Sequence, residues 1–289
     1  ARMIPAFGSA SVFIAAGLIP LLVLPLLIVR VPESIRFLAL KKQQARIVDV
    51  LMRMKAIDLW NGKMPNAVAE VRAPISSLFT QGRALGTLLL WVTLFASLLL
   101  TYLLINWMPM MARRSGFGVE AAVTAVSMLN LGSVAGCLII GRLADRYNTA
   151  IIIGSGFALG TVAIVLAGHA GQSSTLLCTI AFVSGALSLG AQICTIALCS
   201  SFYETFLRAT GVGWGMGIGR GGAIVGPVLG GLLLAAGAGA STLFLVAGLT
   251  SLVSAMGVYS LGLFVPRFRM LHRGGDTGEQ GVAVSSARP

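Results

Sequence analysis

The chain has 289 residues, of which 56% are hydrophobic and only 10% charged, and its formal net charge is +12. A water-soluble domain of this length needs far more charged surface, so the composition excludes a soluble globular protein and predicts an integral membrane protein. The basic residues form no stripe interleaved with aromatic side chains, so we expect no nucleic-acid partner.

Long apolar runs with at most one charge predict seven membrane-spanning helices, because about 20 apolar residues cross a hydrocarbon layer of ~30 Å. The runs 147–203 and 209–266 are each long enough for two spans, and they divide at small-residue breaks near 168–174 and 237–241. The other predicted spans are residues 12–29, 84–112 and 121–141. The expected fold class is therefore all-α, a polytopic membrane helix bundle.

The lysines and arginines predict how the chain is oriented. Seventeen of the 21 lie on one side of the predicted spans, with ten in residues 30–83, two at 142–146, one at 208 and four beyond residue 266. Because short cytoplasmic loops carry the excess of lysine and arginine, we expect this side, with the carboxy terminus, to be cytoplasmic.

The polar stretch at residues 30–83 separates one span from a block of six. Apolar residues Ile47, Val50, Leu51 and Met54 recur there at helical spacing, which predicts an amphipathic helix at the membrane surface. The alternative is a solvated linker. Since the chain also begins without methionine, we interpret it as a piece of a longer protein whose first five spans are missing.

The sequence offers no arrangement typical of an enzyme. It has no Ser/His/Asp or Cys/His set, metal cluster or phosphate loop, so we expect no catalytic residues, metal or cofactor. The four cysteines lie within or at the ends of apolar runs, without metal spacing, and are interpreted as core residues with no disulfide.

Arg220 is the single formal charge between residues 209 and 266. An arginine within the membrane costs a few kcal/mol to insert, so it usually faces a protein interior or a water-filled cavity. Its guanidinium can hold a carboxylate through two parallel hydrogen bonds, which lysine cannot reproduce. We therefore expect Arg220 to bind an anionic substrate; the alternative is a structural arginine paired with helix carbonyls or with an acid elsewhere.

Glycines are dense in the same span. Small residues four positions apart allow helices to approach closely within lipid. The residues predicted to serve this packing are Gly211, Gly215, Gly219, Gly222, Gly226 and Pro227. The span is interpreted as a rocking helix beside a cavity, and close static packing is the alternative for each glycine.

Aromatic and amide side chains supply candidate contacts for a flat substrate. Trp107 with Asn106, Trp214 near Arg220, and Tyr102 are the candidates. The alternative for both tryptophans is the aromatic belt at the membrane interface.

The turn after the third predicted span contains Gly141, Asp145 and Arg146. The glycine permits a tight turn, and the two charges can form charge-assisted bonds that hold one conformational state. We expect a conformational latch here, and an ordinary charged loop is the alternative.

Several motifs resemble those of a known family. Pro32-Glu33-Ser34-Ile35-Arg36 resembles the Pro-Glu-Ser signature of the major facilitator superfamily, and Gly141-Arg142-Leu143-Ala144-Asp145-Arg146 resembles its Gly-x-x-x-Asp-Arg signature. Its aromatic acid:proton symporter branch is resembled by Leu90-Trp91, Asn106-Trp107-Met108-Pro109 and the segment from Arg208 through Trp214 to Arg220. After Arg146 the sequence departs from the pattern, with Tyr147-Asn148-Thr149.

The resemblance implies a truncated major facilitator fold. Residues 1–29 would end the amino-terminal bundle, 30–83 would be the cytoplasmic central loop, 84–266 the carboxy-terminal six-helix bundle and 267–289 a disordered cytoplasmic tail. Glu33 and Arg36 would join the latch.

The resemblance also implies proton-coupled uptake of an aromatic acid anion across the inner membrane by alternating access, driven by the proton gradient. The proton-coupling acid of the family belongs to an Asp-Gly-x-Asp motif in the first helix, which this chain lacks. We therefore expect the missing amino-terminal half to be an obligatory partner.

Two alternatives remain open. One is a major facilitator carrier for a sugar, a dicarboxylate or a drug, because both cytoplasmic signatures are shared across the superfamily; Arg220 argues against a neutral sugar. The other is a seven-helix receptor, suggested by the span count alone.

Overall fold

The computed structural model describes residues 14, 17–18, 20–25, 38, 43–54, 74–114, 116–168 and 173–265. The chain forms two units, residues 1–71 and 72–289, which are described separately.

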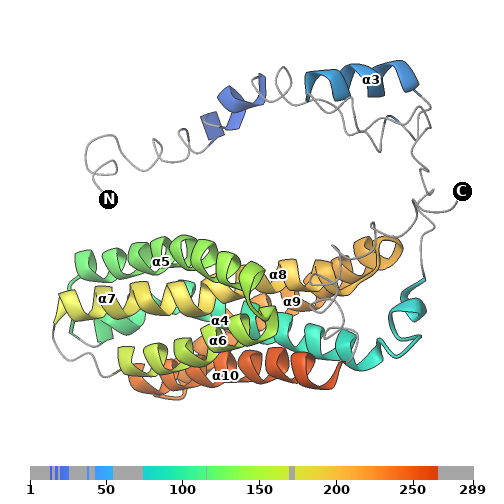
Figure 1. The fold of residues 1–289 in the computed structure, drawn as a ribbon. Coiled ribbons are helices and arrows are strands. Elements are labelled where there is room, and N and C mark those ends of the chain that lie inside the picture. Colours follow the sequence, from blue (N-terminus) through green and yellow to red (C-terminus); the bar gives the residue numbers. More distant parts are fainter. Residues whose placement is uncertain are drawn as a thin grey trace, which may run out of the picture. The chain divides into compact units, whose positions relative to one another are not determined.

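In the first unit, helix α3 spans Gln44–Arg53 (Figure 1). Ile47, Val50 and Leu51 are buried, and Arg53 forms an exposed ion pair with Asp49, N–O 3.1 Å. Half of the predicted first span lies outside the described residues, and the half that is described is helical.

The described part of the second unit consists of helices joined by short turns, and six of the helices are long and apolar enough to cross a membrane. Within lipid a helix satisfies its own backbone hydrogen bonds, so long apolar runs fold in this way. The helices are η2 Ile75–Leu78, α4 Ala84–Arg114, α5 Val119–Arg146, α6 Thr149–Ala167, α7 Ser174–Ser184, η3 Gly185–Leu189, α8 Gly190–Phe202, α9 Thr205–Ala235 and α10 Ala240–Phe264. α7, the π-helical η3 and α8 form one continuous span. The six spans predicted after residue 83 are confirmed.

Local chemistry places several helix ends. Asn148, where the sequence departs from the family motif, caps α6 by accepting hydrogen bonds from the backbone N of Ala150 and Ile151, at 3.1 and 3.2 Å. Gly237 has φ of +82°, which favours glycine, and it makes the predicted break between α9 and α10.

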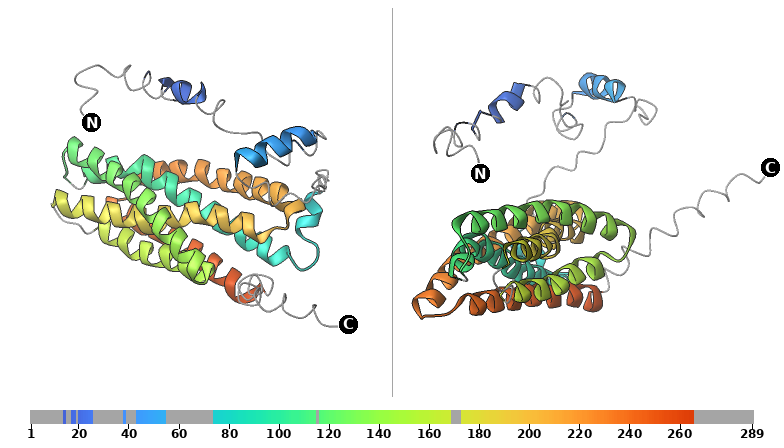
Figure 2. Two further views of the ribbon diagram at one scale, coloured as in Figure 1. Left: turned by 45° about the horizontal axis from the view of Figure 1, so that its top comes forward. Right: turned by 90° about the vertical axis from the view of Figure 1, so that its left-hand side faces the viewer.

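The packing of the helices repeats within the bundle. α4 packs closely against α9, as α5 packs against α7 and η3, while α10 packs against both α4 and α6 (Figures 1 and 2). The first set of three spans is α4, α5 and α6, and the second set is α7–α8, α9 and α10. The first span of each set packs against the second span of the other set, as in internal structural repeats.

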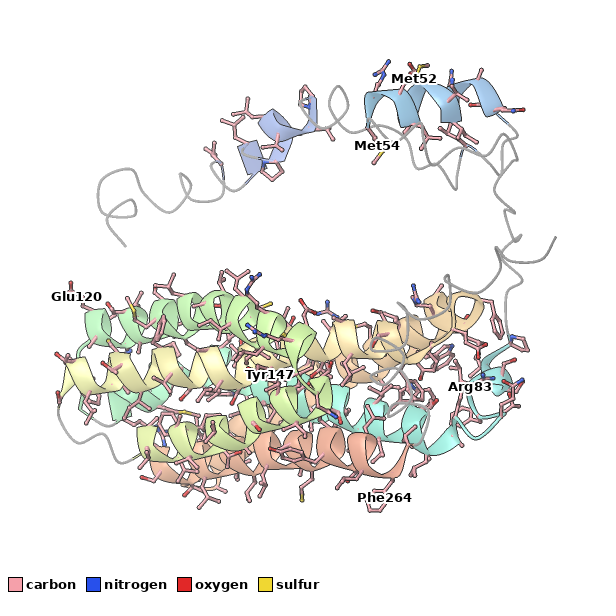
Figure 3. All side chains as sticks on the ribbon, viewed as in Figure 1. Met52, Met54, Arg83, Glu120, Tyr147 and Phe264 are labelled. Atoms are coloured by element: carbon pink, nitrogen blue, oxygen red, sulfur yellow. The ribbon has the colours of Figure 1, made fainter. Side chains whose placement is uncertain are left out.

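Successive helices alternate in direction, so their termini gather at two ends of the bundle. Figure 3 labels Arg83 and Phe264 at one end, here the Arg83 end, and Glu120 at the other, here the Glu120 end. Arg142, Arg146 and Arg208 belong to the Arg83 end because they lie at the end of α5 and the start of α9. Arg113 and Arg114 finish α4 at the Glu120 end.

Candidate functional site

Arg220 and Tyr102 are in direct contact between α9 and α4. The Arg220 Nη1 donates a hydrogen bond of 2.9 Å to the Tyr102 hydroxyl oxygen. Arg220 is exposed and Tyr102 is half-buried within the bundle. The guanidinium is thus tied to α4 while remaining accessible.

One face of α9 lies directly against α4 because glycines line it. A Cβ at Gly215 or Gly219 would meet the side chains of Leu94 and Leu98, respectively. A Cβ at Gly222 would meet the carbonyl oxygen of Phe95, and one at Gly226 that of Leu99, 2.6 Å away. Gly211 lies instead against the ring of Tyr203.

A second glycine face of α9 is open. A Cβ at Gly213 or Gly217 would have no heavy atom within 4 Å. Gly217 precedes Arg220 by about one helical turn, so the open face leads along α9 to the arginine. α9 therefore has a closed glycine face against α4, and an open glycine face beside Arg220.

Trp107 and Asn106 lie about one turn beyond Tyr102 on α4. The Trp107 Nε1 donates a 3.0 Å hydrogen bond to the Pro227 carbonyl, and its ring fills the space over Gly230. The Asn106 Nδ2 donates to the Tyr102 carbonyl at 2.8 Å. Both side chains thus make contacts that organise α4 and its packing on α9.

Trp214 belongs to a separate aromatic cluster with Trp91 and Phe79. Its ring stacks on that of Trp91, with centroids 6.3 Å apart and planes at 28°. Phe79 meets Trp91 edge-on at 5.4 Å. The structure therefore joins Trp214 to Trp91, while Arg220 is joined to Tyr102.

Trp91 also lines an apolar pocket of about 440 Å³ formed by α4, α9 and α10. Its walls are Leu88, Trp91, Val92, Phe95, Ala96, Leu99, Ile218, Thr250 and Val253. The Thr250 hydroxyl donates to the carbonyl of Ala247 at 2.8 Å, within its own helix. The pocket therefore offers apolar surface and no charge.

The predicted latch residues lie at the Arg83 end. Gly141 is half-buried, and Asp145 and Arg146 are exposed. In the part of the chain that is described, neither charged side chain forms an ion pair. Glu33 and Arg36 lie outside the described residues.

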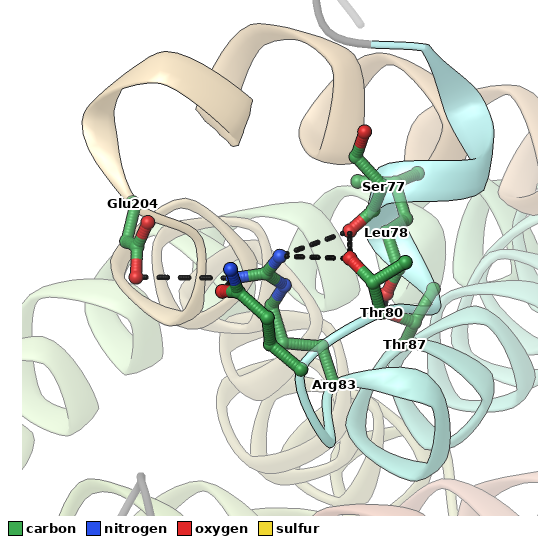
Figure 4. A network of polar contacts seen from close by, with 7 residues as sticks. Ser77, Leu78, Thr80, Arg83, Thr87 and Glu204 are labelled. Carbon is green, nitrogen blue, oxygen red and sulfur yellow. Dashed lines mark hydrogen bonds and ion pairs between the residues drawn. The ribbon is translucent and has the colours of Figure 1, made fainter.

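The sequence did not single out Arg83, whose side chain is only 2% exposed. Its guanidinium donates to the Ser77 carbonyl at 3.1 Å, the Thr80 hydroxyl at 3.2 Å and the Gln81 side-chain oxygen at 2.8 Å. It also lies 3.8 Å from a carboxylate oxygen of Glu204, which directly precedes α9 (Figure 4). The one available signal was the position of Arg83 just before an apolar run, where an orienting charge is the ordinary interpretation.

The Tyr203 hydroxyl extends this connection between α4 and the start of α9. It donates to the Thr87 hydroxyl at 3.2 Å, and Thr87 donates to the Leu78 carbonyl at 2.9 Å. Burial raises the pKa of Tyr203 to about 12. The phenol is therefore neutral at physiological pH and acts as a structural hydrogen-bond donor.

The structure offers no alternative centre of chemistry among the residues it describes. Those residues contain no group of three or more His, Cys, Asp or Glu side chains that could hold a metal ion. The cysteines Cys137, Cys178, Cys194 and Cys199 are free and buried or half-buried.

Comparison with known proteins places the chain among membrane transporters. Residues 2–219 match the Major Facilitator Superfamily. A gallate transporter of Pseudomonas putida is 36% identical over 91% of this chain and 59% of its own length. A benzoate transport protein of Acinetobacter baylyi is 33% identical over 80% of this chain and 50% of its own length. A 4-hydroxybenzoate transporter of Pseudomonas putida is 34% identical over 82% and 54%, respectively.

The chain spans about half the length of the curated relatives it matches. The matched parts of these relatives are their carboxy-terminal halves. The resemblance to the family drawn from the sequence motifs is thereby confirmed.

Proposed function

Because the chain belongs to the Major Facilitator Superfamily, we propose that it forms the carboxy-terminal half of a proton-coupled carrier for an aromatic carboxylate. The observation that supports this most is the exposed Arg220 guanidinium, held by Tyr102 beside the open glycine face of α9. A cation within a membrane span is suited to bind a carboxylate. The absence of side chains at Gly213 and Gly217 leaves room for a flat ring.

The proton-coupling group of this carrier lies in an amino-terminal half that pairs with this chain. None of the nine acidic residues of the sequence lies in the middle of a span. Arg220 can therefore bind the anion, while a carboxylate on the other half takes up the proton. The Arg83 end faces the cytoplasm of the inner membrane, as its excess of arginine favours. The latch residues Asp145 and Arg146 are exposed at that end and are available to hold it in one conformation.

The experiment measures uptake of labelled 4-hydroxybenzoate into cells that produce this chain together with an amino-terminal half. Wild type and Arg220→Ala are compared with and without a proton uncoupler. Arg114→Ala is the matched control, since Arg114 is an exposed arginine that donates to a backbone carbonyl, that of Ala238, at the Glu120 end. We expect uncoupler-sensitive uptake in wild type and the control, and its loss in Arg220→Ala.

Each part of the proposal has its own contrary result. Uptake at the same rate with and without the uncoupler contradicts proton coupling. No uptake of any aromatic acid by well-inserted wild type contradicts the substrate class. Normal uptake by Arg220→Ala contradicts the role of the arginine.

A further inference from the structure

We propose that Tyr102 is a positioning residue that holds the Arg220 guanidinium whenever no substrate carboxylate is bound, and so controls the return of the unloaded carrier. This inference rests on the proposed function and assigns Tyr102 a task separate from contact with the substrate.

The geometry makes Tyr102 a partner that Arg220 can exchange. Its hydroxyl oxygen accepts one hydrogen bond, from Nη1, and guanidinium has five donors. The arginine therefore keeps donors for a ligand while it is bound to Tyr102. A carboxylate accepts two parallel charge-assisted bonds where the hydroxyl accepts one, so it competes favourably for the guanidinium.

The packing of α9 against α4 determines the position of Arg220 along the helix axis relative to Tyr102. Gly219 lies against Leu98, and Gly222 lies against the backbone of Phe95, so glycines on both sides of Arg220 in the sequence contact α4. A bulkier residue at these positions would move α9 away from α4. The Arg220–Tyr102 bond is therefore a product of this close approach.

In each transport cycle a symporter changes its access from one side of the membrane to the other twice. One change takes place with substrate bound, here the loaded passage, and the other without it, here the unloaded passage. In the loaded passage the substrate carboxylate satisfies Arg220. In the unloaded passage the carrier changes its access while the guanidinium has no anion, and an unsatisfied cation within the membrane is costly. Tyr102 supplies a hydrogen-bond acceptor for that step alone, so its removal slows the return of the unloaded carrier and spares exchange.

The test compares net uptake with exchange in proteoliposomes that contain the complete transporter, with its amino-terminal half. Net uptake of labelled 4-hydroxybenzoate under an imposed proton gradient requires the unloaded return, whereas exchange against preloaded 4-hydroxybenzoate does not. For Tyr102→Phe we expect the ratio of net uptake to exchange to fall about tenfold, the effect of one hydrogen bond to a charged group. This ratio does not depend on how much protein is inserted.

Tyr259→Phe is the matched control. Its hydroxyl makes a 3.0 Å hydrogen bond with Ser155 between α10 and α6, so the substitution removes an equivalent inter-helix bond away from Arg220. We expect an unchanged ratio. Tyr102→Gln, which keeps a neutral acceptor, should recover part of the ratio lost in Tyr102→Phe.

Three results overturn the inference. An equal loss of both activities in Tyr102→Phe leaves the ratio unchanged and makes Tyr102 a substrate contact, whereas wild-type values of both activities show that the bond has no role in the return step. The same fall in Tyr259→Phe makes the effect a general one of helix packing. If inserted wild type performs neither activity with any aromatic acid, the proposed function itself fails.

Discussion

Arg83 and Arg220 are two arginines of one helical bundle with opposite surroundings. Arg83 is almost fully buried at the boundary between η2 and α4, where three hydrogen bonds and one ion pair hold it. Arg220 is exposed well inside α9, and within the described residues one neutral hydroxyl is its side-chain partner. An arginine held by several partners of its own chain stabilises architecture, whereas one with a single partner has donors left for a ligand.

The largest effect on transport is expected from a substitution of Arg220. Arg220→Lys keeps the positive charge but loses the planar guanidinium that can form two parallel hydrogen bonds with a carboxylate. We therefore expect uptake of the aromatic acid to fall about 100-fold, which corresponds to about 2.7 kcal/mol of activation free energy. The thermal stability of the purified protein in detergent should not change. Uptake close to the wild-type rate would leave Arg220 with a structural role like that of Arg83.

The opposite pattern is expected at Arg83. Arg83→Met removes the hydrogen bonds to Ser77 and Thr80 and the ion pair with Glu204, so unfolding should become easier by about 2–3 kcal/mol. Thermal unfolding monitored by tryptophan fluorescence measures this. Glu204→Gln should destabilise the fold less than Arg83→Met. Glu204 is 39% exposed, and such ion pairs contribute about 1 kcal/mol or less. A stable Arg83→Met variant without transport would instead assign Arg83 to function.

The two glycine faces of α9 provide a matched pair. Gly222→Ala places a methyl group against the carbonyl oxygen of Phe95 and should destabilise the bundle by about 1–3 kcal/mol. Gly217→Ala points into open space and should stay within about 0.5 kcal/mol of wild type. Equal effects on thermal unfolding would erase the distinction between the closed and the open face.

The smallest expected effect concerns pH and the Arg83 end. The pKa of Tyr203 rises from 10.0 to about 12 on burial, so the folded state keeps a proton that the unfolded state loses between these values. The stabilisation is complete below pH 10 and declines above it, by about 1 kcal/mol at pH 11. Tyr203→Phe should flatten the dependence of the unfolding midpoint between pH 10 and 11, and an unaltered slope would assign that titration to another group.

The sequence predicted the spans of the second unit closely. The expected span 84–112 corresponds to α4, Ala84–Arg114, and the expected break at 237–241 coincides with the turn at Gly237. Such features are local, because apolar length and a glycine with positive φ act within one helix or one turn. The Arg220–Tyr102 bond joins two of the predicted site residues, although they lie 118 positions apart.

Other parts of the site could not be predicted from the sequence. Trp107 was a candidate substrate contact, and its indole nitrogen donates to Pro227, 120 positions away. Trp214 was a candidate beside Arg220 because they are close in sequence, and its ring stacks on Trp91. Sequence spacing does not say which neighbouring helix a side chain meets.

By itself, the sequence determined that this chain is a helical membrane polypeptide that resembles the Major Facilitator Superfamily, where six of its spans lie and which span carries a lone arginine. These properties follow from apolar length, charge and short motifs, which are read along the chain. The tertiary structure alone decided that Arg83 is buried and Arg220 open, and which glycines of α9 contact α4. Burial and hydrogen bonding depend on helices that are distant in sequence, so they exist only once the bundle has packed.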